Sequence, residues 1–509
     1  MTIQDRRKAL DILGSRRVAV MIVAYNAEKH IESVLARIPH DIVNGLAEIY
    51  VLDDSSGDAT YDVTVEAGRK LNIRNLTVFR TPANRGYGGN QKLGYTYAMR
   101  QGFDVVIMLH GDGQYAPECL PDLIAEFGSD VDMVLGSRMM DKRGALKGGM
   151  PFYKWIGNQL LTWFENMMLN SNMTEFHTGY RAFRVNTLRK VPFQYCSDSF
   201  HFDSEILIQF ISAGCIIREV PIPTHYGDEV CHVKGLRYAW DCIKSVIKYS
   251  LFKVGLFYDP LLDFDLFESE TYFYKKARTS LHQYVLTREF RPDEKVLDFG
   301  AAAGYMAAQI AKRAGHVTAV DYEAPRHGGK AKAVAWDLSG DFEQIFGRDS
   351  FDTVLALDVL EHLDDPEIAV QRIARILKPG GCFLASTGNI GYVVMRIMLL
   401  CGVFNYGKRG ILDKTHKRLF TLYTFKHLLR RYGFKVEEIR GFGPPICDMI
   451  SSTWPFSWLD SISWALARLW PGMFAYNFLI TASRVMSLEE VYRDTFIQDE
   501  MSEKHEKKG

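Results

Sequence analysis

The feature that most constrains the fold is an alternation, in both halves of the chain, of short apolar runs with helix-like segments. In the first half, apolar runs at 18–23, 49–52, 76–79, 105–109 and 133–135 each end in a polar or glycine-rich cluster. Continuous apolar runs of strand length, separated by helices, are typical of a parallel sheet covered on both faces. The sequence therefore predicts an α/β fold in each half.

The length of 509 residues exceeds what one ordinary core accommodates, so we expect two domains of about 200–250 residues. Lys plus Arg and Asp plus Glu balance at 61 each, which argues against a nucleic-acid partner. The eight cysteines form no CxxC pair, the start carries no apolar signal-peptide core, and no run of 18 apolar residues occurs. We therefore expect a cytoplasmic protein with reduced thiols and no transmembrane span.

Polar residues follow the apolar runs where each predicted strand ends. Asp53 and Asp54 follow the second run and can accept hydrogen bonds from a base edge and a ribose. Asp112 and Gln114 follow the fourth run and offer oxygen ligands that suit Mg²⁺ or Mn²⁺ on a diphosphate. Arg138, after the fifth run, can add a charge-assisted bond to the same phosphates. Ligands of open α/β sheets bind outside the carboxyl ends of strands, so we expect one shared site.

The motifs AYNAE (24–28), DDSSGD (53–58), NRGYGGN (84–90), HGDGQ (110–114), GSR (136–138), TGYRAF (178–183), FDSE (202–205) and EVPIP (219–223) occur in this order. Over residues 16–230 the chain resembles family 2 glycosyltransferases, and its nearest branch resembles the dolichyl-phosphate mannosyltransferases. The resemblance implies a GT-A fold with a Rossmann-like sheet, a nucleotide-sugar donor, a divalent metal and inversion at the anomeric carbon. It assigns donor binding to Tyr25, Asn26, Glu28, Asp53, Asp54, Asn84, Gly86, Asp112, Arg138 and Arg181. It assigns metal binding to Asp112 and Gln114, and His110 is a further candidate ligand.

Two departures from that family affect the metal and the acceptor. His110 stands where the family has an aspartate, and it either ligates Mn²⁺ or only fills space. His225 and the pair Asp228-Glu229 replace basic residues of the lipid-phosphate branch, so a polyprenyl-phosphate acceptor matches less well than the donor. A glycan, a polyprenyl phosphate or a small molecule therefore stay open as acceptors.

Asp203 and Glu205 are candidates for the catalytic base, because a carboxylate beside a hydroxyl acceptor can take its proton. Either of them can instead cap a helix or pair with an arginine. If the acceptor is itself a phosphate, no strong base is needed.

A predicted helix at 236–254 places apolar residues on one face, at positions 236, 240, 243, 247, 251 and 254, with basic residues elsewhere. Packing against a domain is the favoured interpretation, and a peripheral contact with the inner face of a membrane is the alternative. We place the glycosyltransferase domain at 1–257, a linker at 258–269, the second domain at 270–487 and a charged tail at 488–509.

In the second half, the run 295–299 leads into a G-x-A-x-G turn at 300–304, which is not the G-x-G-x-x-G pattern of a dinucleotide site. Asp321 ends the next run, where an acid can bind a ribose diol. Asp337 and Asp358 end the following two runs. Over residues 270–485 this order resembles class I S-adenosylmethionine-dependent methyltransferases, which have a Rossmann-like fold.

That resemblance assigns the cofactor contacts. Asp298, Gly300, Ala302 and Gly304 would meet the methionine moiety, with Ala302 replacing a usual glycine. Asp321 would bind the ribose of the cofactor, and Asp337 would bind its adenine. Asp358 would line the face on which the methyl group is transferred. His362 and His416 are candidate bases for an oxygen acceptor, because imidazole titrates near neutral pH.

The sequence thus predicts a bifunctional transferase that moves a sugar from a nucleotide donor and methylates the same or a related product. In the alternative, the methyltransferase-like domain acts on an unrelated small molecule or only binds its cofactor as a regulator.

Overall fold

The structure is a computed structural model that describes residues 3–128, 130–224, 235–259, 261–262, 279–327, 329–486 and 491. The chain divides into two compact units, one comprising Met1–Phe252 and Asp259–Glu268, the other Lys253–Tyr258 and Ser269–Gly509. The first break therefore falls five residues before the predicted boundary at 257. Most of the predicted linker, all of the tail except Val491, and residues His225, Asp228 and Glu229 lie outside the described residues.

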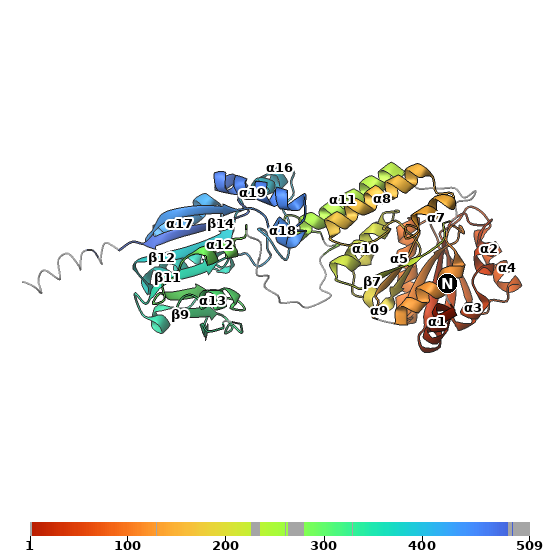
Figure 1. Cartoon of the computed structure of the whole chain (residues 1–509), viewed down its shortest axis with the longest axis horizontal. Coiled ribbons are helices and arrows are strands. Elements are labelled where there is room, and N and C mark those ends of the chain that lie inside the picture. Colours follow the sequence, from red (N-terminus) through yellow and green to blue (C-terminus); the bar gives the residue numbers. More distant parts are fainter. Residues whose placement is uncertain are drawn as a thin grey trace, which may run out of the picture. The chain divides into compact units, whose positions relative to one another are not determined.

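The first unit is built on a seven-stranded sheet in the order β3-β2-β1-β4-β6-β5-β7 (Figure 1). The strand β6 runs antiparallel to both of its neighbours, and the other pairings are parallel. The strands are β1 (Val18–Ala24), β2 (Glu48–Asp53), β3 (Leu76–Arg80), β4 (Val105–His110), β5 (Met133–Ser137), β6 (Arg181–Arg184) and β7 (Ile217–Pro221). The α/β prediction is confirmed for this half.

Both faces of this sheet are covered, and the central strand shows why its sequence is apolar throughout. All seven residues of β1 are buried. Val18, Val20 and Ile22 belong to one core cluster, whereas Ala19 and Met21 belong to the cluster on the opposite face. The helices are α1 (Ile3–Ser15), α2 (Ile31–Ala36), α3 (His40–Gly45), α4 (Thr60–Lys70), α5 (Gly86–Gln101), α6 (Leu120–Ala125), α7 (Lys142–Lys147), α8 (Phe152–Leu169), α9 (Val185–Leu188), α10 (Phe202–Ser212) and α11 (Gly235–Lys253).

The helix α11 forms where the sequence predicted it, but its predicted apolar face is not the packed one. Its buried residues are Cys242, Val246, Tyr249 and Ser250, and three of them lie one position before the predicted stripe, which is about 100° around the helix. Four members of that stripe are exposed instead: Leu236, Trp240, Ile247 and Leu251. The packing interpretation is therefore wrong for these four residues, because the helix carries apolar side chains on more than one face.

The second unit also contains a seven-stranded sheet, in the order β10-β9-β8-β11-β12-β14-β13. The first five of these strands are parallel, and β14 pairs antiparallel with β12 and β13. The strands are β8 (Lys295–Phe299), β9 (His316–Asp321), β10 (Lys332–Ala335), β11 (Phe351–Leu357), β12 (Leu377–Gly388), β13 (Phe434–Phe442) and β14 (Asn477–Arg484). The predicted α/β fold is confirmed here as well.

The helices of the second unit are α12 (Leu281–Thr287), α13 (Tyr305–Ile310), α14 (Glu343–Phe346), α15 (Pro366–Ile376), α16 (Val393–Leu400), α17 (Leu422–Arg431), α18 (Ile446–Met449), α19 (Phe456–Leu469) and α20 (Pro471–Phe474). Within the described residues of the whole chain, every helix is too short or too polar to cross a lipid bilayer.

Candidate functional sites

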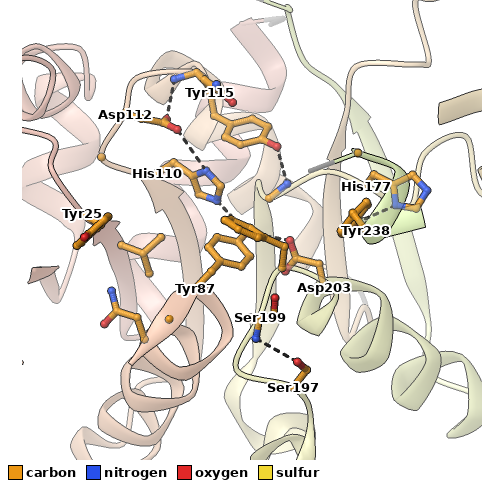
Figure 2. A pocket seen from close by; sticks show the side chains of 18 of the residues that line it. Tyr25, Tyr87, His110, Asp112, Tyr115, His177, Ser197, Ser199, Asp203 and Tyr238 are labelled. Carbon is orange, nitrogen blue, oxygen red and sulfur yellow. Dashed lines mark hydrogen bonds and ion pairs between the residues drawn. The ribbon is translucent and has the colours of Figure 1, made fainter. Parts of the chain in front are cut away.

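A cavity of about 1210 Å³ lies at the carboxyl ends of β1, β2 and β4 in the first unit (Figure 2). These three strands are adjacent and parallel, so their carboxyl ends meet at one edge of the sheet. Nine of the predicted site residues line the cavity: Tyr25, Asp54, Asn84, Gly86, His110, Asp112, Gln114, Arg138 and Asp203. The structure therefore brings together residues from six separate motifs.

Of the two neighbouring acids after β2, only Asp54 lines the cavity. Its Oδ1 accepts hydrogen bonds from the backbone N–H of Arg85, at 2.8 Å, and from the hydroxyl of Thr81, at 3.2 Å. Asp53 is fully buried, and its carboxylate accepts from the backbone and hydroxyl of Ser56. Asp53 thus holds the turn that presents Asp54, rather than contacting a ligand itself.

Asn26 and Glu28 also brace this region without lining the cavity. The side-chain oxygen of Asn26 accepts from the N–H of Gly57 at 3.0 Å, and Glu28 accepts from the N–H of Ala59 at 3.1 Å. Asn26 adopts a left-handed backbone conformation, with φ +50°. The two residues therefore tie the loop after β1 to the loop after β2.

The ring of His110, at the end of β4, belongs to a chain of hydrogen bonds. The hydroxyl of Tyr87 donates to Oδ2 of Asp203 at 2.8 Å and lies 3.0 Å from Nε2 of His110. Because a carboxylate only accepts, the hydroxyl oxygen of Tyr87 accepts from the Nε2–H of His110. Burial lowers the pKa of His110, so the ring is neutral at pH 7 and its Nδ1 carries the lone pair.

The residues around that lone pair fit a divalent metal. Nδ1 of His110 lies 3.9 Å from Oδ2 of Asp112, and Gln114 lines the same part of the cavity. The backbone N–H of Gln114 donates to Oδ1 of Asp112 at 3.0 Å, which fixes the carboxylate. One imidazole nitrogen with carboxylate and amide oxygens is a donor set that Mn²⁺ accepts more readily than Mg²⁺.

The two arginines assigned to phosphate have different surroundings. Arg138 lines the cavity and forms an ion pair with the fully buried Glu175, which outweighs burial and lowers the pKa of that carboxyl. Arg181 is fully buried outside the cavity and donates to the backbone carbonyls of Thr178, Asp203 and Phe176 at 2.6–2.8 Å. The phosphate contact predicted for Arg181 does not fit this position, because its three nitrogens are used inside the core.

The two candidate bases are also separated. Asp203 lines the cavity, where it accepts from Tyr87 and, at 3.1 Å, from the side chain of Gln91. Glu205 does not line the cavity. Its carboxylate accepts from the backbone N–H of Ser197 at 2.6 Å and so supports the loop at 197–199. Both carboxylates are therefore engaged with protein donors.

Sequence reasoning missed Tyr87 and Glu175. Tyr87 lies in the quoted NRGYGGN motif, but its contact with His110 depends on how α5 and β4 pack. Glu175 is buried beside Arg138. It lies three residues before the TGYRAF motif, and no sequence pattern marked it as part of the site.

In the second unit, the G-x-A-x-G turn lies between β8 and α13 and adjoins the end of β9. Ala302 adopts φ +46°, the left-handed region that favours glycine, and its N–H donates to Asp321 Oδ2 at 2.7 Å. A Cβ on Gly300 would overlap the side chain of Val359. The turn therefore keeps a glycine-like shape despite its alanine, and it fits a cofactor that approaches the backbone closely.

Asp298, the fourth residue of β8, is almost fully buried, and one carboxylate oxygen has no hydrogen-bond partner. Burial raises the pKa of Asp298 to about 7. An unpaired buried oxygen beside the turn fits the amino group of a bound S-adenosylmethionine. Asp337 is exposed after β10 and accepts from the backbone and hydroxyl of Ser339.

Asp358 ends β11 in a left-handed conformation, with φ +55°. Its carboxylate accepts from the hydroxyl of Ser386 at 2.7 Å and from Asn477 at 3.1 Å. The nearby Glu361 is buried, and burial followed by the charge of Asp358 raises its pKa to about 8. Glu361 was not assigned from sequence, although it is an acidic residue between apolar residues in VLEHL (359–363), which could have drawn attention to it.

The two candidate histidines of this unit lie against each other. The rings of His362 and His416 have centroids 4.7 Å apart. Burial, and then the neighbouring His416, lowers the pKa of His362. The segment after Asp413 therefore returns to the end of β11, where the backbone of Lys417 also donates to the carbonyl of Glu361.

Two family models match the chain. The model described as glycosyl transferase family 2 matches residues 19–191, and the model described as methyltransferase domain matches residues 270–439. The first match contains the strands β1 to β6 and the second contains the strands β8 to β12.

Three curated relatives are similar to parts of the chain. An uncharacterized protein of Methanocaldococcus jannaschii is 30% identical over 226 residues, which are 44% of this chain and 88% of the relative. The undecaprenyl-phosphate mannosyltransferase of Micrococcus luteus is 28% identical over 212 residues, 40% of this chain and 82% of the relative. The ubiquinone biosynthesis O-methyltransferase of Hahella chejuensis is 30% identical over 114 residues, 21% of this chain and 48% of the relative.

Proposed function

This chain is a transferase that joins a family 2 glycosyl transferase domain to a methyltransferase domain, and we propose that it glycosylates a polyprenyl phosphate and then methylates the product. The first reaction takes its sugar from a nucleotide-diphosphate sugar. The observation that carries this proposal is the single cavity that collects Asp54, Asp112 and Arg138 from three strand ends.

Within this cavity, the donor nucleoside lies against Asp54, and its diphosphate lies toward Asp112 and Arg138. His110, Asp112 and Gln114 would hold a divalent metal, Mn²⁺ or Mg²⁺, which when bound would supply positive charge to neutralise the diphosphate. Arg138 adds a fixed positive charge whose position is set by Glu175.

The acceptor is inferred from the state of the carboxylates. Among the described residues that line the cavity, Asp203 and Asp198 are both engaged, the first by Tyr87 and Gln91, the second by Lys92. A hydroxyl acceptor needs a base, whereas a phosphate acceptor is already ionised. The phosphate oxygen attacks the anomeric carbon as its bond to the diphosphate breaks, and a single displacement inverts the configuration. The name of the Micrococcus luteus relative supports the same acceptor class.

A lipid acceptor also accounts for the apolar surface beside the cavity. The helices α8 and α11 lie side by side (Figure 1), and both Tyr153 and Leu236 are exposed while lining the cavity. Further along α8, Leu160 and Trp163 are 62% and 59% exposed. We propose that this surface rests in the headgroup region of the inner membrane leaflet, so that a polyprenyl chain stays in lipid while its phosphate enters the cavity.

The glycosyl transfer is tested with purified full-length protein, a panel of nucleotide sugars and undecaprenyl phosphate in vesicles. We expect a glycosyl-phospholipid product by mass spectrometry, and its loss in Asp112→Asn. Transfer to hydroxyl acceptors alone, or unchanged activity of Asp112→Asn, would contradict the proposal.

For the second reaction, the turn containing Gly300, Ala302 and Gly304 would hold S-adenosylmethionine, Asp321 would bind its ribose and Asp337 would bind its adenine. The cofactor supplies an activated methyl group, and the protein aligns the acceptor and removes its proton. The pair His362 and His416 at the end of β11 provides the base for an oxygen acceptor. The similarity to an O-methyltransferase supports oxygen as the methylated atom.

This step is tested by supplying labelled S-adenosylmethionine together with the glycosyl-phospholipid. We expect label in that lipid, and none with Asp321→Asn. If label appears only in unrelated small molecules, the two activities do not act on the same product. Cofactor binding by calorimetry without turnover on any acceptor would make the second domain a regulator.

A further inference from the structure

A second group of metal-ligating side chains lies behind the cavity wall, away from His110 and Asp112. Glu165 comes from α8, His177 from the segment before β6, and Cys242 from α11. Their ligand atoms all lie within 4.8 Å of one another, and Glu165 and Cys242 are fully buried. Residues far apart in sequence thus present a carboxylate, an imidazole and a thiol to one point.

The hydrogen bonding around this point is incomplete. Nε2 of His177 lies 3.1 Å from Oε2 of Glu165, but the two atoms are not aligned as a hydrogen bond. Both carboxylate oxygens of Glu165 are buried without a hydrogen-bond partner. Apart from this 3.1 Å ion-pair contact the three buried atoms have no protein partner, and a ligand between them would satisfy all three.

The arrangement does not match a nucleophilic relay. In a Cys–His–acid relay the thiol and the carboxylate contact opposite ring nitrogens. Here Nδ1 of His177 lies 3.0 Å from the hydroxyl of Tyr238 (Figure 2), and Nε2 is left to face Glu165. A metal-binding imidazole typically has its other nitrogen held in this way. The thiol of Cys242 in turn accepts from the hydroxyl of Ser204 at 3.2 Å.

We propose that Glu165, His177 and Cys242 bind one divalent transition-metal ion of the zinc class. Thiolate and imidazole ligands select such ions over Mg²⁺, and three protein ligands leave one tetrahedral position for a further ligand. The hydroxyl of Tyr238 orients the imidazole.

The location of this ion gives it a structural role. It joins α8, α11 and the segment before β6, and all three contribute to the cavity wall through Asn158, Tyr238 and His177. The ion would therefore hold the two helices together on the side where the acceptor enters. This role does not depend on which sugar or acceptor the cavity takes.

The site is tested on the full chain with Co²⁺ as a spectroscopic probe. We expect a thiolate-to-cobalt charge-transfer band, which reports on this site alone because the donor set of His110, Asp112 and Gln114 has no thiolate, and which saturates when one ion is bound here. Cys242→Ser should abolish the charge-transfer band, and Tyr238→Phe should weaken Co²⁺ binding by roughly 10-fold or more. Asp112→Asn and the exposed Cys401→Ser serve as matched controls and should keep the band.

Circular dichroism establishes that each variant is folded. If Cys242→Ser does not fold, Glu165→Gln replaces it, and its Co²⁺ affinity should fall while the charge-transfer band persists at higher Co²⁺ concentration. If the wild-type protein shows no thiolate band at saturating Co²⁺, Glu165 and His177 form only an ion pair and the proposal is wrong. Persistence of the band in folded Cys242→Ser would also overturn the proposal.

Discussion

At the scale of single residues, His110 is the side chain on which the metal preference of the proposed glycosyl transferase site depends. Its neutral ring directs Nδ1 toward Asp112 because Nε2 donates to Tyr87. The side chain that departs from the family pattern is therefore held in a geometry suited to a ligand. The sequence left two interpretations open for this residue, and this geometry is compatible with the one that we propose, a metal ligand.

Replacing His110 with aspartate should shift metal use from Mn²⁺ toward Mg²⁺, because an oxygen ligand replaces a softer nitrogen. We expect the ratio of Mn²⁺- to Mg²⁺-supported activity to fall roughly 10-fold. Tyr87→Phe should instead weaken Mn²⁺ binding by about 10–100-fold without changing the metal preference, since it frees the ring but leaves the metal-ligating atoms unchanged. Mn²⁺ affinity is measured by electron paramagnetic resonance. An unchanged ratio in His110→Asp would exclude the imidazole as a ligand.

Asp298 should make the stability of the methyltransferase domain depend on pH. Burial raises its folded pKa to about 7, above an unfolded value of about 3.9, so folding takes up a proton. This contribution is complete below about pH 4 and is lost as the pH rises through about 7. At 1.4 kcal/mol per unit, the loss is on the order of 4 kcal/mol at most.

Asp298→Asn should flatten that pH dependence, whereas substituting the exposed Asp293 by asparagine should not. The measurement is hydrogen-exchange protection of β8 and β11 between pH 4.5 and 8, corrected for intrinsic rates. A wild-type domain whose protection rises over this range would contradict the assignment.

At the scale of secondary-structure elements, the sequence predicted the strands and their ends but not which side chain at each end faces the ligand. Asp53 and Asp54 are adjacent, and only the packing of the following turn places Asp53 in the core and Asp54 at the cavity. The same limit applies to Arg181, whose carbonyl partners come from two separate segments. On α11, apolar residues occur on two faces, and periodicity alone could not choose the buried one.

The exposed apolar surface of α8 and α11 should bind membranes. Substituting both Leu160 and Trp163 by glutamate removes apolar burial and adds negative charge, so vesicle binding should fall at least about 10-fold. Co-sedimentation with anionic vesicles measures it. Substituting Ile368, an exposed residue of the second unit, by glutamate is the matched control. Equal loss in both variants, or none in either, would argue against this surface.

At the scale of the whole molecule, one chain carries two candidate donor sites, each at the carboxyl edge of its own sheet. The motif order was enough to predict both folds, because parallel strands bring their ends together irrespective of loop detail. The metal cluster behind the first cavity could not be predicted, since Glu165, His177 and Cys242 follow no ligand spacing along the chain.

The two reactions should be separable by single substitutions. Asp112→Asn should abolish sugar transfer yet methylate glycosyl-phospholipid supplied from outside, and Asp321→Asn should do the reverse. Product masses from parallel incubations with both donors decide the matter. Methylation that fails in Asp112→Asn even with added product would show that the two sites do not act independently.

Because Gly179 has no side chain, it leaves room for the imidazole of His110. A methyl group there would overlap the imidazole of His110 and press on the hydroxyl of Tyr87. An imidazole at position 110 therefore requires that position 179 carries no side chain. Alanine at 179 would leave no room for the ring at the end of β4.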